Sequence, residues 1–291
     1  MKFRSIGAQF VRWICVGFEQ LLMTFLGYDP AFMNTASCQS AVTFIDGDKG
    51  VLRYRGYGIE HLAEKCRFLE VAYLLPSGEL PTAAELSDWV QTITHHTMIH
   101  ETTKKFLKGF RYDAHRIGMF TRTVAALSTV YPEASNVRDK ATSQLEFARL
   151  IGKVPTIAAY TYRHSLGYPC VYPDNELSYA ANFKNMLWKM VEPKYQANPI
   201  LARALDILFI LPADHEQNCS ANVMRAVGSA LADPFVSVAA AAMLSRPLHG
   251  GANEEVLKML DEFGSKDPCL VVLGAAQGGP READGIRTSS L

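Results

Sequence analysis

The chain has 291 residues, of which 48% are apolar and 20% are charged, an ordinary balance for a globular protein with a large core. Lys plus Arg and Asp plus Glu both number 29, so the formal net charge is zero. A neutral balance gives no overall attraction to nucleic acid or to an anionic membrane. No stretch of about 18 residues lacks a charged side chain, as a transmembrane helix would require. We therefore expect a soluble protein that binds neither nucleic acid nor membrane.

Two features bear on the location of the protein. The cysteines are scattered without any Cys-x-x-Cys pair, at Cys15, Cys38, Cys66, Cys170, Cys219 and Cys269. Such spacing favours free thiols in a reducing, cytoplasmic compartment over a disulfide framework or a metal site. The first residues are basic and precede a short apolar run at 13–18, which distantly resembles a targeting segment. Because no small-residue cleavage site follows, residues 1–27 are interpreted as an N-terminal extension.

The first regular structure is predicted after Ser40. Val42, Phe44 and Ile45 form a β-prone run, residues 46–50 (DGDKG) have turn chemistry, and residues 51–54 form a second run. This pattern predicts a β-hairpin, which is the only strand pair that the sequence indicates.

From Gly58 onward, apolar residues recur at helical spacing. A capping box at 82–85 marks one helix start, and Pro199 and Pro234 suit first-turn positions. The alanine-rich run 238–243 is apolar on all sides, so its helix is expected to be buried centrally. The expected helices are 59–75, 82–93, 99–110, 115–130, 140–152, 156–164, 178–190, 199–211, 220–231, 234–244 and 253–263.

These elements predict an all-α fold, with one large helical domain and a small β-hairpin near its N-terminus. After Gly264 the helical pattern stops, and several glycines and prolines follow. Residues 264–291 are therefore expected to form a disordered tail.

The segment 214–218 (DHEQN) places three ionisable side chains between two apolar helices. Such groups are costly to bury unless they are hydrogen-bonded or used in function. One interpretation is a helix-connecting turn, in which Asp214 or Asn218 caps a helix and a backbone carbonyl satisfies His215. The other is a site for chemistry centred on His215.

The segment 247–254 (PLHGGANE) places His249 in a glycine-rich turn directly before a helix. The helix dipole disfavours an imidazolium there, so His249 is expected to stay neutral and able to donate to a developing enolate or oxyanion. The alternative is a plain loop histidine, with Asn253 as the helix cap.

The remaining motifs are weaker. His96 and His100 share a helical face as His-x-x-x-His, but the glutamate of the zinc-protease motif is absent, so they are interpreted as surface or regulatory histidines. No phosphate-binding loop, nucleophile elbow or dinucleotide fingerprint is present in the sequence.

Several segments, in order along the chain, resemble citrate synthase, and in particular the bacterial type that NADH regulates. They are 44–63 (FIDGDKGVLRYRGYGIEHLA), 96–101 (HTMIHE), 171–183 (VYPDNELSYAANF), 198–201 (NPIL), 213–218 (ADHEQN) and 247–260 (PLHGGANEEVLKML). The resemblance runs from about Tyr28 to about Phe263. Residues 28–263 are therefore expected to form the large helical domain of that fold.

The resemblance implies an acyltransferase of the tricarboxylic acid cycle that condenses acetyl-CoA with oxaloacetate to give citrate, without a metal or a resident cofactor. It implies that His249 is the catalytic histidine that stabilises the enol, and that His215 and Asn218 bind oxaloacetate. An alternative substrate pair, with propionyl-CoA in place of acetyl-CoA, would make the protein a 2-methylcitrate synthase.

The resemblance also implies an allosteric site for NADH, formed by His96, Thr97, Met98, Tyr131, Arg149 and Lys153. A hydroxyl, an aromatic ring and two cations suit the phosphates and rings of a dinucleotide. His95 stands where the family often has arginine, which is expected to weaken the binding of NADH.

The departures from the family matter equally. Its second catalytic histidine, in a Gly-x-Gly-His-x-Val motif, has no match in this sequence, and neither do its catalytic aspartate and its carboxylate-binding arginines. We therefore expect the small CoA-binding domain to be largely missing and the chain to be truncated after the His249 motif. Two hypotheses follow: an incomplete enzyme that another chain completes, or a non-catalytic remnant acting as an assembly or regulatory module. Either is expected to form a homo-oligomer or to pair with citrate synthase subunits.

Overall fold

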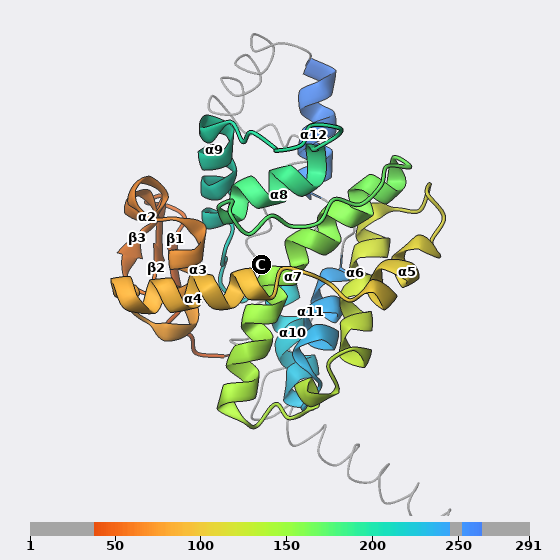
Figure 1. Cartoon of the computed structure of the whole chain (residues 1–291). Coiled ribbons are helices and arrows are strands. Elements are labelled where there is room, and N and C mark those ends of the chain that lie inside the picture. Colours follow the sequence, from red (N-terminus) through yellow and green to blue (C-terminus); the bar gives the residue numbers. More distant parts are fainter. Residues whose placement is uncertain (1–37, 245–251, 264–291) are drawn as a thin grey trace, which may run out of the picture. The chain divides into compact units, whose positions relative to one another are not determined.

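A computed structural model describes residues 38–244 and 252–263 of the chain (Figure 1). Its described elements belong to one compact unit, Ser40–Ser290. They are helices with one small sheet, which confirms the predicted fold class. The N-terminal extension at 1–27, the tail at 264–291 and His249 lie outside the described residues.

The sheet is antiparallel in the order β1-β2-β3, with strands β1 (Thr43–Asp46), β2 (Val51–Tyr54) and β3 (Tyr57–Gly58). The predicted hairpin is confirmed, and its register places Thr43 directly opposite Tyr54. In the turn, Gly50 has a φ of 64°, which glycine adopts without the steric cost of a Cβ. The sequence did not indicate β3, because a strand of two residues has no alternation to detect.

The predicted helical segments are all present in the structure, although several boundaries differ. The helices are α2 (Ile59–Lys65), α3 (Phe68–Ser77), α4 (Ala83–His95), α5 (Glu101–Lys108), α6 (Arg116–Ala126), α7 (Lys140–Ser165), α8 (Tyr179–Trp188), α9 (Pro199–Ile210), α10 (Cys219–Ser229), α11 (Pro234–Ala242) and α12 (Ala252–Phe263). Short 3₁₀ helices, η2 (Leu127–Thr129) and η3 (Pro132–Ser135), lie between α6 and α7. Within the described ranges, none of the helices has the length and apolar character that a membrane crossing requires.

The segment 59–75, predicted as one helix, is broken into α2 and α3. Cys66 and Arg67 have extended backbone, which ends the hydrogen-bond ladder of α2. Arg203 of α9 donates to the exposed carbonyls at this end, among them that of Cys66 at 2.7 Å. The prediction was wrong because a contact from a helix far along the chain stabilises the break.

The opposite error occurs in α7, where the two expected helices 140–152 and 156–164 form one continuous helix that contains Pro155. A proline lacks the N–H that would pair with the carbonyl four residues earlier, here that of Ile151. The hydroxyl of Tyr179 in α8 donates to this carbonyl at 2.9 Å. The helix therefore continues to Ser165, because a neighbouring helix supplies the missing hydrogen bond.

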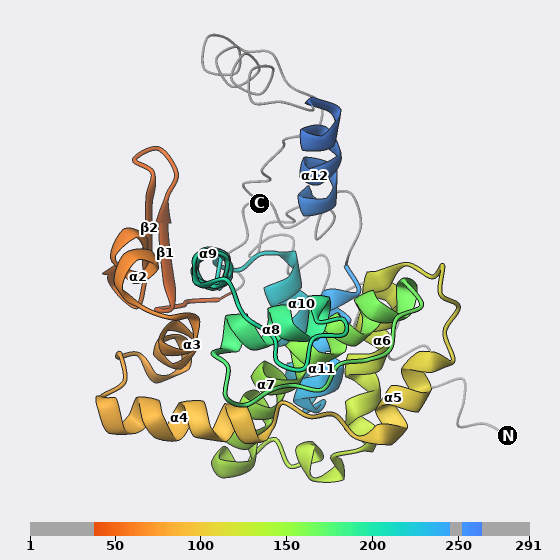
Figure 2. The ribbon, with the colours of Figure 1, turned by 45° about the horizontal axis from the view of Figure 1, so that its top comes forward.

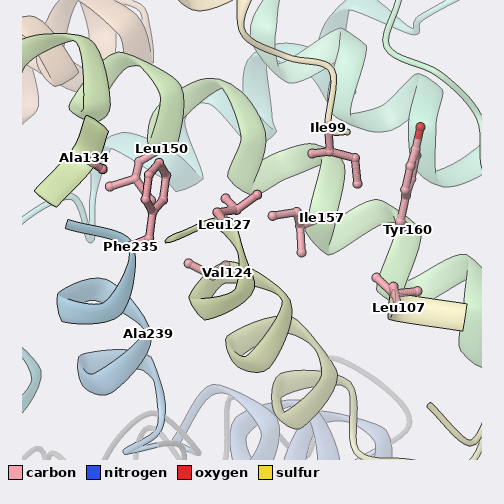
Figure 3. Packing of buried hydrophobic residues seen from close by; sticks show 10 residues of the cluster. All are labelled: Ile99, Leu107, Val124, Leu127, Ala134, Leu150, Ile157, Tyr160, Phe235 and Ala239. Carbon is pink, nitrogen blue, oxygen red and sulfur yellow. The ribbon is translucent and has the colours of Figure 1, made fainter. Parts of the chain in front are cut away.

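The largest core cluster joins α6, α7 and α11 (Figure 3). Val124 and Leu127 pack against Ile157 and Phe235, all fully buried. We predicted that the alanine-rich helix would be buried centrally, and α11 does pack between α6 and α10, with Ala239 1% exposed. Its burial ends at the C-terminus, where Met243, the next residue, is 53% exposed.

A second cluster ties the sheet to the helices around it. Tyr54 of β2, Leu62 of α2, Val71 and Leu74 of α3 and Ile210 of α9 are each 1% exposed or less. Figure 2 shows α2 and α9 beside the hairpin. The end of α9 is thereby fixed against the N-terminal hairpin, and the segment 214–218 follows shortly after this end.

Gly152 of α7 is predicted to be required for the close approach of α7 to α4. A Cβ there would lie 2.8 Å from the carbonyl oxygen of Ile93, and backbone cannot move aside as a flexible side chain can. We expect Gly152→Ala to lower the free energy of unfolding by about 1–3 kcal/mol, measured by denaturant unfolding.

Gly228 of α10 provides the matched control. A Cβ at Gly228 meets nothing within 4 Å, so Gly228→Ala should raise the free energy of unfolding by roughly 0.5–1 kcal/mol. Equal effects of the two substitutions would show that the contact between α7 and α4 does not limit stability.

Candidate functional site

The segment 214–218 forms the turn between α9 and α10, and Tyr54 holds its first part. The phenol of Tyr54 is fully buried, with its hydroxyl 2.8 Å from the carbonyl oxygen of Leu211 and 3.0 Å from that of Asp214. The backbone N–H of Asp214 donates to the same hydroxyl at 3.3 Å. Burial raises the pKa of Tyr54, so the hydroxyl keeps its proton at neutral pH.

The side chains of Asp214 and Asn218, the first and last residues of the segment, also make hydrogen bonds. Thr43 of β1 donates its hydroxyl to the carboxylate of Asp214. The side-chain oxygen of Asn218 accepts from the backbone N–H of Ala221 at 2.9 Å and so caps α10. The interpretation of Asn218 as a helix cap is therefore confirmed. Its amide nitrogen makes no hydrogen bond to any described residue.

His215 lies between these two fixed points and is exposed. Its imidazole makes no hydrogen bond within residues 38–244 and 252–263, so a backbone carbonyl does not satisfy it there as one interpretation held. The next residue, Glu216, has a φ of 56°, which is unusual for a residue with a Cβ. The turn thus presents His215 to solvent on a backbone that Tyr54 and Asn218 hold at either end.

The predicted NADH residues come together at a second place, where the end of α4 meets α7. Lys153 is 2% exposed, and its ammonium donates to the carbonyl oxygens of His96 at 2.9 Å and Met98 at 2.7 Å. The hydroxyl of Thr156 donates to the carbonyl oxygen of Thr97 at 2.7 Å. The loop after α4 is therefore fixed to α7 through its main chain.

Arg149 also has partners within the chain. Its guanidinium lies over the ring of Tyr131, with 4.4 Å between its carbon and the ring centroid. One nitrogen contacts the carboxylates of Glu133 and Glu146, each at 2.6 Å. Glu146 is fully buried, which raises the pKa of its carboxyl against the opposing effect of Arg149.

The electrostatics of this cluster reflect burial. Burial, together with repulsion from Arg149, lowers the pKa of Lys153 to about 8. Burial and the nearby Lys153 lower the pKa of His96 as well. The structure thus brings the six predicted residues together. However, Lys153 already donates to backbone carbonyls, and Arg149 already pairs with carboxylates of the same chain.

Sequence reasoning missed some residues that shape these sites. Glu146 stands three residues before Arg149, a spacing typical of helical ion pairs, so it left a signal in the sequence. Tyr54 and Thr43 left none, because their partners are far along the chain.

A cleft of about 620 Å³ lies elsewhere in the described structure. It is lined mainly by residues of α2, α3, α4, α8 and α9, and it includes none of the predicted site residues. In the part of the chain that the structure describes, no group of three His, Cys, Asp or Glu side chains could hold a metal ion.

Comparison with known proteins gives a consistent result. A family model described as citrate synthase, C-terminal domain, matches residues 31–282, and so reaches past Phe263, where we expected the resemblance to end. A peroxisomal citrate synthase of Dictyostelium discoideum is 53% identical over 253 residues, which cover 82% of this chain and 50% of that protein. A second citrate synthase of the same organism is 49% identical over 246 residues, covering 82% and 48%. The chain thus spans about half the length of these curated relatives.

Solved structures agree with this result. Citrate synthase from Pyrobaculum aerophilum matches with a TM-score of 0.75 and 32% identity, over 87% of this chain and 64% of that chain. The ternary complex of the Thermoplasma acidophilum enzyme with carboxymethyl coenzyme A and oxaloacetate matches with a TM-score of 0.73 and 29% identity, over 84% and 62%. The predicted helical fold of the citrate synthase type is therefore confirmed.

The buried Lys153 generates a prediction about pH. An unfolded lysine has a pKa near 10.4, so between about pH 8 and that value the unfolded chain binds more protons than the folded one. The free energy of unfolding should therefore rise with pH in this window. We expect wild type to gain about 1–2 kcal/mol relative to Lys153→Met between pH 7 and pH 9.5, measured by denaturant unfolding.

The comparison with Lys153→Met removes the contributions of other groups that titrate in the same window, such as buried tyrosines. Parallel stability curves for the two proteins would contradict the lowered pKa of Lys153.

Proposed function

This chain belongs to the citrate synthase family, and we propose that it takes part in condensing acetyl-CoA with oxaloacetate and water to give citrate and CoA. The observation that carries the proposal is the turn between α9 and α10. It presents an exposed His215 beside the half-buried Asn218, on a backbone that Tyr54 and the helix cap hold.

The turn suits oxaloacetate, a dicarboxylate with a ketone. The N-terminal end of α10 carries the positive end of the helix dipole, which favours an anion. His215 can donate a hydrogen bond to a carboxylate or to the ketone oxygen, and the amide nitrogen of Asn218 has no partner among the described residues. The carboxylate of Asp214 accepts a hydrogen bond from Thr43, which occupies one of its oxygens.

In this proposal His249 acts on acetyl-CoA. By family resemblance a neutral His249 donates to the enol that forms when acetyl-CoA loses a methyl proton. Propionyl-CoA in place of acetyl-CoA would give 2-methylcitrate, and the residues above do not select between these acyl groups.

A second candidate is a non-catalytic role in assembly or regulation. One observation favours it. Helix α9 exposes large apolar side chains, with Ile200 at 77%, Leu201 at 55% and Leu208 at 60%. Such a face suits pairing with a second copy of this chain or with a citrate synthase subunit.

NADH is proposed as a weak regulatory ligand of this chain. The loop of His96, Thr97 and Met98 lies against Arg149 and Lys153, which are the cations that a dinucleotide would need.

The cytoplasm is proposed as the location of the protein. The described cysteines are free thiols, which fits a reducing compartment. A fluorescent fusion would distinguish the cytoplasm from the peroxisome, after which one relative is named.

The oxaloacetate proposal predicts that His215→Ala weakens the binding of oxaloacetate about 10- to 100-fold, since hydrogen bonds to charged groups are the stronger ones. Isothermal titration calorimetry of the full chain measures the dissociation constant. His61→Ala is the control, because His61 is also exposed but lies on α2. Unchanged binding in His215→Ala would refute the assignment of this residue.

Release of CoA from acetyl-CoA and from propionyl-CoA, in the presence of oxaloacetate, separates the candidate roles. General acid–base groups each contribute about 10²–10⁴-fold to a rate, so a non-catalytic chain should release CoA far more slowly than the usual 1–10³ per second. Turnover at ordinary rates would reject the non-catalytic role. Restoration of turnover by an added citrate synthase subunit lacking its own His249 counterpart would support completion by another chain.

The regulatory proposal predicts that Glu133→Gln strengthens NADH binding about two- to five-fold, because it removes the more exposed of the two carboxylates that pair with Arg149 and leaves only Glu146. Fluorescence titration with NADH measures the affinity. Glu176→Gln is the matched control, since Glu176 pairs with Lys194 elsewhere on the surface. Absence of binding by both wild type and Glu133→Gln would end the regulatory proposal.

A further inference from the structure

We infer that Tyr54, with Thr43 beside it, is a positioning residue for the oxaloacetate turn, so that the N-terminal hairpin sets the orientation of His215. This inference rests on the proposed function. Tyr54 does not itself reach the ligand in this proposal; it acts through the backbone that carries His215.

The first step is the number of backbone groups that meet at one hydroxyl. The oxygen of Tyr54 lies within hydrogen-bond distance of the carbonyl oxygens of Ile210, Leu211 and Asp214, at 3.3, 2.8 and 3.0 Å. The N–H of Asp214 donates to it. The last carbonyls of a helix have no partners within the helix, so this hydroxyl terminates α9 and starts the turn.

The second step is the register of the hairpin. Thr43 and Tyr54 are directly opposite each other across β1 and β2. Side chains of directly opposite residues lie on the same face of an antiparallel pair, so both hydroxyls reach the same segment. Tyr54 holds the main chain of Asp214, and Thr43 holds its carboxylate.

The third step is that the turn is fixed at both ends. Asp214 is held by the hairpin, and Asn218 is held by its cap on α10. Only three residues lie between them, and Glu216 has the left-handed φ of 56°. A non-glycine residue keeps such a conformation only where its surroundings impose it. The direction of His215 therefore depends on the position of Asp214.

The ring of Tyr54 and its hydroxyl have separable roles. The ring packs with Leu62, Val71, Leu74 and Ile210, and a phenylalanine would keep this packing. Tyr54→Phe therefore removes the hydrogen bonds to the turn while the cluster stays filled. Thr43→Val removes the second contact at a half-buried position, and serves if Tyr54→Phe does not fold.

Tyr179→Phe is the matched control. Tyr179 is partly buried, and its hydroxyl also donates to a helix carbonyl, that of Ile151 in α7, at 2.9 Å. It removes the same chemical group and a comparable hydrogen bond at a place that does not contact the turn.

The experiment measures two quantities on the full chain of each variant: the dissociation constant of oxaloacetate by calorimetry, and amide hydrogen exchange of residues 211–218. We expect Tyr54→Phe to bind oxaloacetate about 10-fold more weakly and to exchange faster in this segment. Thr43→Val should change both quantities in the same direction. Tyr179→Phe should leave both unchanged, even where its midpoint of thermal unfolding falls by a similar amount.

The outcomes separate this inference from the proposed function. If wild type binds oxaloacetate and Tyr54→Phe binds it equally well, the positioning role is overturned and the proposed function stands. Equal losses in Tyr54→Phe and Tyr179→Phe would also overturn it, because stability alone would then explain the effect. If wild type binds no oxaloacetate, both the proposed function and the positioning role fall.

Discussion

The main constraint in this fold is that carbonyls at helix ends and helix breaks need donors, and side chains from distant elements supply them. Arg203 serves the end of α2, Lys153 the loop after α4, and Tyr54 the end of α9. Arg163, 1% exposed, donates to the carbonyls of Leu187 and Lys189 at the end of α8. A buried polar group without a partner is costly, so each of these contacts determines where a helix stops.

This constraint links stability to the candidate sites. The hydroxyl that terminates α9 also fixes the turn that carries His215, so the same contact shapes the helix and the place for a ligand. At α7 the effect is the reverse. Lys153 and Arg149 are the cations proposed to bind a dinucleotide, but carbonyls and carboxylates of the chain already engage them. His215 in the turn is thus exposed, whereas Lys153 and Arg149 are paired with groups of the chain itself.

Residues with strong local signals were predicted correctly. The capping box at Thr82 and the turn at Gly50 act within a few residues, so the sequence shows them directly. The break at Cys66 and the continuity of α7 through Pro155 were predicted wrongly. Both depend on donors from other helices, which no window of sequence contains.

The sequence by itself determined the helical class, the hairpin and the family, and it singled out the histidines at 215 and 249 as candidates, because periodicity and motifs are local properties of the chain. The tertiary structure alone decided which polar groups form hydrogen bonds or ion pairs within the fold. It left His215 exposed and without a partner among the described residues, whereas it gave Lys153 and Arg149 partners of their own. The physical reason is that hydrogen-bond satisfaction of buried groups is a property of the packed chain, set by residues that meet only when it folds.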